Sequence, residues 1–449
     1  MGLSLIILAA GQGTRMQSDL PKVLHPLGGV PMIAHALASG QAMEPARIAV
    51  VCGHGADAVA AAVAEFAPDA QVVIQSEQKG TGHAVAQAAP VLEGVEGDAV
   101  VLYGDTPFIR PETLEAMETA RAQGADIVVL GFTAADPGRY GRMVTVEERL
   151  LRIVEYKDAT EGERAIRLCN SGVMMADAAV LMRLVGQIGN RNAAGEYYLT
   201  DIVALGRAQG LISQVVLCDE AETLGINTRA ELARAEAAFQ AQKRAEMLEN
   251  GVTLTAPETV HFAFDTVIGR DAWVEPNVVF GPGVTVETGA RIRAFSHLEG
   301  CHVSRGAVVG PFARLRPGAE LAEDVHIGNF VEIKNAQVAE GAKINHLSYI
   351  GDAEIGEAVN IGAGTITCNY DGVFKHRTVV GKGAFIGSNT MLVAPVIVGA
   401  EAMTASGSVI TMDVEPGALA VARGRQSNKA GLAAQMMARL KALKASRKG

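Results

Sequence analysis

Apolar residues recur every six positions along the second half of the chain. A first series runs from Ile268 to Leu298, and further series restart after short interruptions as far as Val398. A small or β-branched residue follows each member of the first series four places later, except that His302 follows Leu298. Neither the 3.6-residue period of a helix nor the two-residue period of a strand explains this spacing.

A fixed short period indicates structural units that cannot bury their apolar side chains alone and must stack on one another. The six-residue repeats therefore predict a parallel β-helix, which we assign, with a C-terminal tail, to residues 251–449. Aromatic residues make up only 4% of the chain, which has 50 glycines. This composition suits a prism filled by aliphatic side chains, with glycine at its corners.

The first half follows a different pattern, in which short apolar runs alternate with helix-like segments. The runs lie at residues 3–8, 48–51, 71–74, 99–102 and 127–130. Such alternation is typical of an α/β fold with a mostly parallel sheet. We therefore assign residues 1–227 to a Rossmann-like domain.

Between the halves, Thr228 and Glu231 have the spacing of a helix capping box. A stretch rich in Ala, Glu, Arg and Gln follows and stops at Asn250-Gly251. The pattern predicts one exposed linker helix over residues 228–250, about 33 Å long at 1.5 Å per residue. We expect it to act as a stiff spacer.

Charge and cysteine content exclude several classes of protein. The net charge of -10 argues against a nucleic-acid partner or a membrane surface. No apolar run approaches the roughly 20 residues of a membrane span. The five cysteines are odd in number and form no C-x-x-C pair, which suggests neither a disulfide framework nor a zinc site. We expect a cytoplasmic protein with reduced thiols.

Candidate chemistry begins where the first apolar run ends, at a glycine loop. Gly11 and Gly13 follow this run, and Arg15 and Lys22 come shortly after it. Glycines let backbone N–H groups approach an anion closely, and a helix N-terminus behind the loop would add a favourable dipole. Asp105 ends another apolar run and is therefore expected at the carboxyl edge of the sheet, where ligands bind in open α/β folds.

The repeats carry polar side chains that a prism does not need, notably Arg316, Lys334, His346 and Tyr349. Outward charges and a lone histidine are more often structural than catalytic. A histidine, however, titrates near pH 6.5 and can accept a proton at neutral pH. The residues by themselves leave both interpretations open.

Three resemblances sharpen these expectations. The glycine loop with Pro21-Lys22 resembles the signature of sugar-1-phosphate nucleotidylyltransferases, and the hexads resemble the left-handed β-helices of the hexapeptide family, which are mostly trimeric acyltransferases. Over nearly its whole length, the chain resembles the bacterial bifunctional N-acetylglucosamine-1-phosphate uridylyltransferase/glucosamine-1-phosphate acetyltransferase family. The segments at residues 314–321, 331–335, 345–356 and 360–365 carry this last resemblance.

For the first half, the resemblance implies a site for UTP, N-acetylglucosamine-1-phosphate and Mg²⁺. Asp105 and Asn227 would hold the metal, while Arg15 and Lys22 would be the catalytic cations. Gln75, Gly80 and Thr81 match the uracil-reading segment. The full implied set of nucleotide and sugar contacts is Leu8, Ala9, Ala10, Gly11, Lys22, Gln75, Gly80, Thr81, Tyr103, Gly104, Asp105, Gly141, Glu155, Asn170 and Asn227.

For the second half, the resemblance implies an acetyltransferase site with His346 as general base. The implied contacts to the sugar phosphate are Arg316, Lys334, Tyr349 and Asn360. An insertion at residues 367–378 would bring Asn369, our candidate oxyanion donor, and Tyr370 to a neighbouring subunit of a homotrimer. The acetyl-CoA contacts would be Ala363, Ser388, Ser406 and Arg423, where Ser406 replaces an expected alanine.

The implied function is acetyl-CoA-dependent N-acetylation of glucosamine-1-phosphate, followed by Mg²⁺-dependent uridylyl transfer from UTP that releases pyrophosphate. Two alternatives stay open at this point. One is a single-activity nucleotidylyltransferase with a structural or regulatory β-helix, although a scaffold has no need of His346 and its polar neighbours. The other is an assembly subunit with a degenerate pocket, although Gly11, Arg15, Lys22 and Asp105 are intact.

Overall fold

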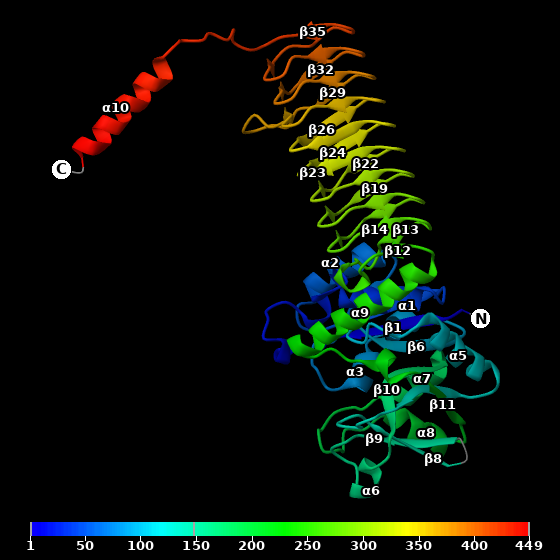
Figure 1. Cartoon of the computed structure of the whole chain (residues 1–449). Coiled ribbons are helices and arrows are strands. Elements are labelled where there is room, and N and C mark those ends of the chain that lie inside the picture. Colours follow the sequence, from blue (N-terminus) through cyan, green and yellow to red (C-terminus); the bar gives the residue numbers. More distant parts are fainter. Residues whose placement is uncertain (1, 147–148, 448–449) are drawn as a thin grey trace. The chain divides into compact units, whose positions relative to one another are not determined.

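The computed structural model describes residues 2–146 and 149–447 and divides the chain into two compact units (Figure 1). The first unit extends to Lys243 and includes Phe262–Phe264, and the second takes the remaining residues. Because this boundary falls inside the helix between the halves, the domain limits at residues 227 and 250 remain predictions. No helix in the described ranges has both the length and the apolar character of a membrane span.

The first unit contains a nine-stranded sheet in the order β5-β4-β1-β6-β10-β7-β11-β9-β8. Its strands are β1 Ser4–Ala9, β4 Arg47–Cys52, β5 Gln71–Ile74, β6 Asp98–Tyr103, β7 Ile127–Thr133, β8 Arg142–Val146, β9 Arg149–Val154, β10 Leu168–Asp177 and β11 Ser213–Leu217. A small hairpin pairs β2 Pro26–Leu27 with β3 Val30–Pro31. All five predicted strands are confirmed.

The sheet is parallel from β5 to β6 and mixed beyond. Strand β10 runs antiparallel to both β6 and β7, and β8 pairs antiparallel with β9. The expectation of a mostly parallel sheet holds for the direction of most strands, and only β9 and β10 run opposite to the rest. A short turn suffices to connect antiparallel strands, so no helix-like segment marks the β8–β9 pair in the sequence.

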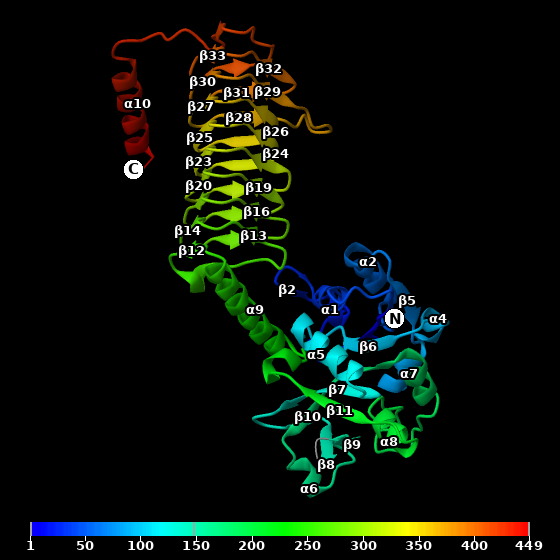
Figure 2. The same ribbon diagram turned by 90° about the vertical axis from the view of Figure 1, so that its right-hand side faces the viewer.

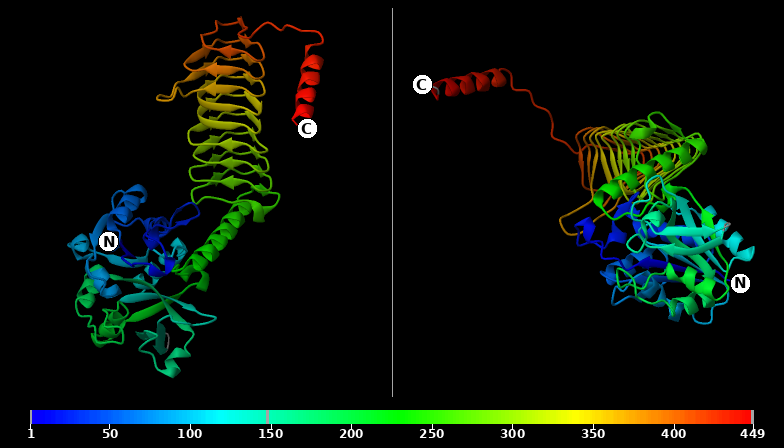
Figure 3. Two further views of the ribbon diagram at one scale, coloured as in Figure 1. Left: turned by 90° about the vertical axis from the view of Figure 1, so that its left-hand side faces the viewer. Right: turned by 90° about the horizontal axis from the view of Figure 1, so that it is seen from below.

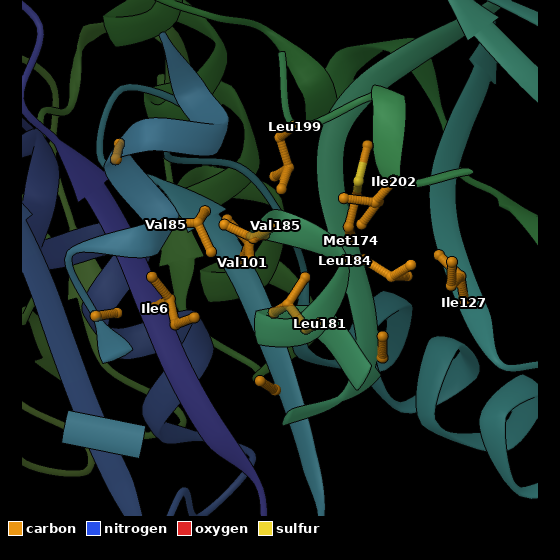
Figure 4. Packing of buried hydrophobic residues seen from close by; sticks show 14 of the residues in the cluster. Ile6, Val85, Val101, Ile127, Met174, Leu181, Leu184, Val185, Leu199 and Ile202 are labelled. Carbon is orange, nitrogen blue, oxygen red and sulfur yellow. The ribbon is translucent and has the colours of Figure 1, made fainter. Parts of the chain in front are cut away.

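Helices cover both faces of this sheet. They are α1 Met32–Gln41, α2 Ala56–Phe66, α3 Thr81–Ala86, α4 Ala89–Leu92, α5 Pro111–Ala122, α6 Glu161–Arg164, α7 Ala178–Val185 and α8 Asp201–Ala208. Ile6 and Val101 belong to the cluster that α3, α4, α7 and α8 complete, which Figure 4 shows in close-up. Leu5 and Ile7 belong to the opposite cluster with α1, α2 and α5. Alternate residues of β1 thus face opposite cores, which explains its unbroken apolar run.

The linker helix is α9, Arg229–Glu249. Its capping box is confirmed, since the Thr228 hydroxyl accepts from the Glu231 N–H at 3.2 Å and the Glu231 carboxylate accepts from the Thr228 N–H at 3.0 Å. The expectation of a fully exposed spacer is wrong, because Phe239 is buried in a cluster with Leu27 and Met32. Apolar burial therefore ties part of this helix to the first unit.

The second unit is a parallel β-helix of stacked short strands (Figures 2 and 3). One of its sheets comprises β12 Thr253–Leu254, β14 Trp273–Val274, β17 Arg291–Ile292, β20 Val308–Val309, β23 His326–Asn329, β25 Lys343–His346, β27 Asn360–Ile361, β30 Phe385–Ile386, β33 Met403–Thr404 and β35 Leu419–Ala420. The other strands are β13 Val267–Ile268, β15 Val279–Phe280, β16 Thr285–Val286, β18 His297–Leu298, β19 Cys301–Val303, β21 Arg314–Leu315, β22 Ala319–Leu321, β24 Glu332–Val338, β26 Tyr349–Ile355, β28 Ile366–Cys368, β29 Thr378–Val380, β31 Met391–Val393, β32 Val396–Val398 and β34 Val409–Ile410. Helix α10, Leu432–Ser446, follows.

The six-residue repeat builds the interior of this β-helix. Register pairs Ile327 with Ile344 and Ile344 with Ile361, and all three side chains are buried. Each aliphatic residue therefore stacks on its counterpart in the next coil. The hexads predicted these strands because every repeat must bury its apolar side chain in the same way.

One corner of the β-helix carries an exposed stack of phenylalanines, which we call the aromatic ladder: Phe295, Phe312 and Phe330. The three residues adopt φ values of 59°, 57° and 57°, a left-handed conformation that is unfavourable for a residue with a bulky side chain. Ring centroids lie 4.9 Å apart between Phe295 and Phe312, and 5.4 Å apart between Phe312 and Phe330. The side chains are 53%, 46% and 55% exposed.

Candidate active sites

A cavity of about 260 Å³ opens beside the carboxyl ends of β1 and β6. Most of the predicted nucleotide contacts line it: Leu8, Ala9, Ala10, Gly11, Lys22, Gln75, Gly80, Thr81, Tyr103 and Asp105. Gly104 lies at the same edge, where its N–H donates to the Leu8 carbonyl at 3.0 Å. Sequence reasoning missed four further lining residues, Val23, Gln78, Ala84 and Glu196.

The glycine loop passes close to Lys22. Gly13 adopts φ 63°, and a Cβ atom built on it would lie 2.6 Å from the Lys22 Cβ, so no larger residue fits there without a shift. The expected helix behind the loop is wrong, because Thr14–Met16 forms one turn of 3-10 helix. A single turn aligns too few peptide dipoles for a strong macrodipole. The features of this loop that suit a polyphosphate are therefore its backbone amides and the side chains of Arg15 and Lys22.

Four polar side chains converge at the mouth of this loop. The Lys22 ammonium donates to the Asp105 carboxylate and, at 3.0 Å, to the Asn227 Oδ1. Arg15 donates to the same Asn227 oxygen at 2.9 Å. The Asp105 and Asn227 oxygens therefore already face one cationic group, and oxygens of this kind are the ligands that Mg²⁺ prefers. The pair fits a divalent cation bound through few protein ligands.

No group of three His, Cys, Asp or Glu side chains in the described part of the chain is arranged to hold a metal. This finding concerns metal sites built entirely by the protein. A cation held by one carboxylate and one amide, with substrate phosphates completing its coordination, does not need such a cluster.

The predicted sugar contacts gather at one place. A Cβ atom on Gly141 would lie 3.4 Å from the Glu155 Oε1 and 3.5 Å from the Asn170 Cβ. The Thr200 hydroxyl, which sequence reasoning missed, donates to the Glu155 Oε1 at 3.1 Å. Burial raises the pKa of the Glu155 carboxyl, and the bond from Thr200 opposes that shift. The group combines hydrogen-bond donors with a strong acceptor, as recognition of sugar hydroxyls requires.

In the β-helix, His346 lies in a column of residues along the corner that continues the aromatic ladder. Backbone bonds link successive coils here: Leu347 N to Asn329 O, Gly364 N to His346 O, Asn389 N to Ala363 O and Gly407 N to Ser388 O. The column therefore reads Asn329, His346, Ala363, Ser388 and Ser406. The candidate base and three candidate acetyl-CoA contacts share one edge of the prism.

Asn329 orients the imidazole of His346. The His346 Nδ1 lies 2.9 Å from the Asn329 Oδ1, which can only accept, so Nδ1 carries the proton. The neutral ring then offers Nε2 as its proton acceptor, which is what a general base requires. Sequence reasoning missed Asn329. It lies 17 residues before His346, which is about the length of one coil of three hexads, so the two residues are neighbours in adjacent coils.

A group of polar and charged side chains surrounds Asp352, which sequence reasoning also missed. Lys334 Nζ lies 3.7 Å from the Asp352 Oδ2, Asn335 donates to Oδ1 at 2.6 Å, and Asn369 donates to Oδ2. The pKa of Lys375 is lowered chiefly because the Lys334 ammonium lies beside it. Two neighbouring ammonium groups outweigh the single carboxylate, so the group can attract a phosphate.

The remaining predicted contacts are more dispersed. Arg316 donates to the Glu332 Oε1 at 2.8 Å, and Glu332 is in register with Tyr349 on the same sheet. Asn360 lies on a different sheet, in register with Lys343. Tyr370 is 60% exposed on the insertion between β28 and β29, and Arg423 is exposed beyond β35. One chain therefore groups Arg316, Lys334 and Tyr349 on one sheet, with Asn360 apart from them.

All five cysteines are free. Burial raises the pKa of the Cys301 thiol to about 12 and that of the Cys52 thiol to about 11. Such thiols stay protonated and unreactive at neutral pH. None of them takes part in either candidate site.

Comparisons with known proteins agree with this division of the chain. The model of the MobA-like NTP transferase domain matches residues 5–171, and the model of the bacterial transferase hexapeptide repeats matches residues 265–300. A solved apo UDP-glucose pyrophosphorylase covers 54% of this chain at 18% identity, with a TM-score of 0.45. That last likeness is too weak to bear on substrates.

Full-length relatives are much closer to this chain. A protein of Dinoroseobacter shibae named "Bifunctional protein GlmU" is 70% identical over 447 residues, which cover 100% of this chain and 99% of the relative. Proteins of the same name from Cereibacter sphaeroides and Jannaschia sp. are 68% and 64% identical. The alignment with the Cereibacter sphaeroides protein covers 99% of this chain and 98% of that relative. The alignment with the Jannaschia sp. protein covers 98% of this chain and 97% of that relative.

Proposed function

The chain belongs to the family of bifunctional GlmU proteins, and we propose that each of its two activities resides in one of the two candidate sites. The protein is a bifunctional transferase of UDP-N-acetylglucosamine biosynthesis, with a uridylyltransferase and an acetyltransferase activity. A single-activity nucleotidylyltransferase with a structural β-helix is not favoured, because the bifunctional relatives align with both halves of the chain.

In the first unit, the cavity takes UTP and N-acetylglucosamine-1-phosphate. Gln75, Gly80 and Thr81 read the uracil, and the glycine loop with Arg15 and Lys22 holds the triphosphate. The sugar lies at the group around Glu155. A sugar-phosphate oxygen attacks the α-phosphorus in line, and pyrophosphate leaves. Here the protein contributes positioning and fixed positive charge, which stabilise the charge that develops on the phosphate oxygens.

Mg²⁺ belongs to this site through Asp105 and Asn227. Support comes from their oxygens, which both accept from the Lys22 ammonium and so lie within reach of one cation. When bound, Mg²⁺ neutralises charge on the phosphates. With Asp105 and Asn227 holding the metal, Lys22 and Arg15 would be available to bind the phosphates of the substrate.

In the second unit, His346 accepts a proton from the amine of glucosamine-1-phosphate as that amine attacks the thioester of acetyl-CoA. Asn329 holds the required tautomer of the ring. Lys334, Arg316, Tyr349 and Asn360 hold the sugar phosphate, and Asn369 donates to the developing oxyanion. Acetyl-CoA follows the column of Ala363, Ser388 and Ser406 toward Arg423.

The protein assembles as a homotrimer in the cytoplasm. The aromatic ladder supports assembly, because its rings remain about half exposed on an unfavourable backbone, and contact with a second copy would remove them from water. The spread of Asn360, Tyr370 and Arg423 over different faces supports it too, since neighbouring copies could bring these residues to one site.

The observation that carries the proposal is that the predicted uridylyltransferase residues and the predicted acetyltransferase residues lie in two different units. A substitution in one site should therefore affect only one of the two reactions. We expect His346→Ala to lower acetyl transfer by about 10²–10⁴-fold, the usual worth of a general base, with uridylyl transfer near normal. Asp105→Ala should lower uridylyl transfer by at least about 10²-fold and spare acetyl transfer. Release of free thiol and of pyrophosphate reports the two reactions separately.

Matched controls are His326→Ala, an exposed histidine one coil from His346, and Asp57→Ala, an exposed carboxylate of α2. Both should leave both rates unchanged. Equal loss of both activities in His346→Ala would assign that residue a role in folding instead. With glucosamine-1-phosphate as the sugar, pyrophosphate should appear only when acetyl-CoA is present.

A further inference from the structure

We propose that His83 is a positioning residue that orients the Gln75 amide and thereby makes the nucleotide cavity prefer uracil over cytosine. The inference rests on the proposed function, in which this cavity binds UTP and Gln75 reads its base. It adds the residue that determines which hydrogen-bonding group Gln75 presents to the base.

The Gln75 amide is held on one side. Gln75 is 3% exposed, and its Nε2 lies 3.2 Å from the Gly80 carbonyl oxygen and 2.9 Å from the His83 Nδ1. A carbonyl oxygen can only accept, so Nε2 rather than Oε1 must face Gly80. With the imidazole nitrogen as the second acceptor, both hydrogens of the amide nitrogen are committed.

His83 has further neighbours besides Gln75. His83 lies on α3, and its own carbonyl accepts from the Gln87 Nε2 at 3.0 Å. The ring lies against Tyr197, with centroids 6.3 Å apart. The Gln87 Nε2 also lies 3.5 Å from the His83 Nε2. Because the contact between Gln75 Nε2 and His83 Nδ1 is much shorter, at 2.9 Å, we assign Nδ1 as the acceptor and the ring proton to Nε2. Of the two contacts that the Gln75 Nε2 makes, the one to the His83 Nδ1 is the shorter.

The Gln75 Oε1 accepts no hydrogen bond from any described residue, and Gln75 lines the cavity. It can therefore present an acceptor to a bound base. Uracil carries a donor, N3–H, at the centre of its pairing edge, whereas cytosine carries a lone pair at that position. The same oxygen thus bonds uracil and faces an unpaired lone pair on cytosine, a mismatch that sites built on buried polar groups reject.

Loss of the His83 acceptor would leave the amide held by the longer bond to Gly80 alone. Gln75 could then rotate and present Nε2 to the base, which suits cytosine N3. One net hydrogen bond corresponds to between about twofold and tenfold in an equilibrium. We therefore expect the preference for UTP to fall by about three- to tenfold.

The test measures kcat/KM for UTP and for CTP, with N-acetylglucosamine-1-phosphate and Mg²⁺, from pyrophosphate release. His83→Leu and His83→Phe remove the acceptor, and the second keeps a ring against Tyr197. Both should lower the UTP-to-CTP ratio by about three- to tenfold. His83→Asn keeps an acceptor near the position of Nδ1 and should hold the ratio within about twofold of wild type.

Gln75→Ala separates this inference from the proposed function. If Gln75→Ala leaves the ratio unchanged, Gln75 does not read the base and the proposed uracil contact fails. If Gln75→Ala lowers the ratio while His83→Phe does not, Gln75 keeps its role and the positioning by His83 is overturned. An equal loss for both nucleotides in His83→Phe would likewise overturn it, since that is the result of a structural role. His54→Leu, at an exposed histidine, is the control, and acetyl transfer by each variant checks folding.

Discussion

Glu155 shows how burial sets the charge of a candidate sugar contact. Burial disfavours the carboxylate and raises its pKa above that of an exposed glutamate, against the bond from Thr200. Between the unfolded and the folded pKa, the folded protein therefore binds more protons at Glu155 than the unfolded chain does. Linkage then makes this residue's contribution to stability fall as pH rises through that interval.

We expect Glu155→Gln, which is neutral at all pH values, to gain stability over the wild type as pH rises from about 4.5 to 8, with little difference at the acid end. Relief of the penalty should raise the melting temperature by about 2–4 °C per kcal/mol. Scanning calorimetry across this pH range measures the difference. Glu115→Gln, on the exposed face of α5, is the control, and a constant difference between Glu155→Gln and the wild type would contradict the prediction.

The same variant bears on catalysis. If Glu155 accepts from a sugar hydroxyl as a carboxylate, its replacement should raise KM for N-acetylglucosamine-1-phosphate by about tenfold, the lower range for a hydrogen bond to a charged group. Acetyl transfer should not change. An unaltered KM for the sugar phosphate would remove Glu155 from the sugar contacts.

At the level of single residues, the sequence predicted those site residues that belong to continuous motifs. It predicted the residues that contact them less well. Lys22 and Asp105 belong to such motifs, and the structure brings them together. Asn329 and His83 lie outside the motifs named above, and Asp352 lies inside one without a predicted role, because each acts through a contact that folding creates. A signal existed for Asn329, since three hexads make one coil and residues about one coil apart become neighbours. The contact between His83 and Gln75 depends on a loop conformation that no period reports.

At the scale of elements, the linker helix shows where sequence patterns mislead. Its composition is polar and rich in good helix formers, which predicted the helix correctly. Composition does not reveal that Phe239 packs beside Gly28, where a Cβ atom would lie 2.4 Å from the phenyl ring. Ala235, Gln240 and Met247 are buried as well, so the expected spacer is a packed element.

The strands of the β-helix make a testable unit, because each inward residue touches its counterparts in adjacent coils. Ile344 is fully buried between Ile327 and Ile361. Ile344→Ala should leave a cavity and lower the unfolding free energy of the β-helix by about 2–5 kcal/mol. Urea unfolding followed by loss of acetyl transfer measures this change.

Ile397→Ala provides the matched control on an outward-facing position of β32, where the side chain is 51% exposed. Its effect should stay within about 0.5 kcal/mol. Equal effects of the two variants would mean that the interior of the prism does not depend on the aliphatic stack. Uridylyl transfer by Ile344→Ala should be retained at urea concentrations that abolish acetyl transfer.

For the whole molecule, the two halves differed in how much of their architecture the sequence predicted. The β-helix follows from a single rule applied along the chain, so its period was sufficient. The order of strands in the first unit depends on pairings between distant segments. Strand β10 lies between β6 and β7 and runs antiparallel to both, and no local pattern in β10 specifies those neighbours.

At the scale of the whole molecule, variants of the aromatic ladder test whether the protein assembles as a trimer. Left-handed backbone at a residue with a bulky side chain costs about 1–2 kcal/mol, and asparagine tolerates it better than phenylalanine does. Replacing Phe295 and Phe312 together by Asn should therefore not destabilise the single chain through its backbone. If the ladder packs against a second copy, the double variant should lose apolar burial and dissociate from trimer toward monomer, which sedimentation velocity measures.

Activity distinguishes the outcomes of this experiment. Acetyl transfer should fall with the trimer, because Asn369 and Tyr370 are proposed to serve a neighbouring copy, whereas uridylyl transfer should persist. Trp273→Asn removes a similarly exposed aromatic residue from β14, away from the ladder. This variant should leave the mass of the assembly unchanged. A ladder variant that keeps the wild-type mass and both activities would show that the exposed rings lie outside the interface between copies.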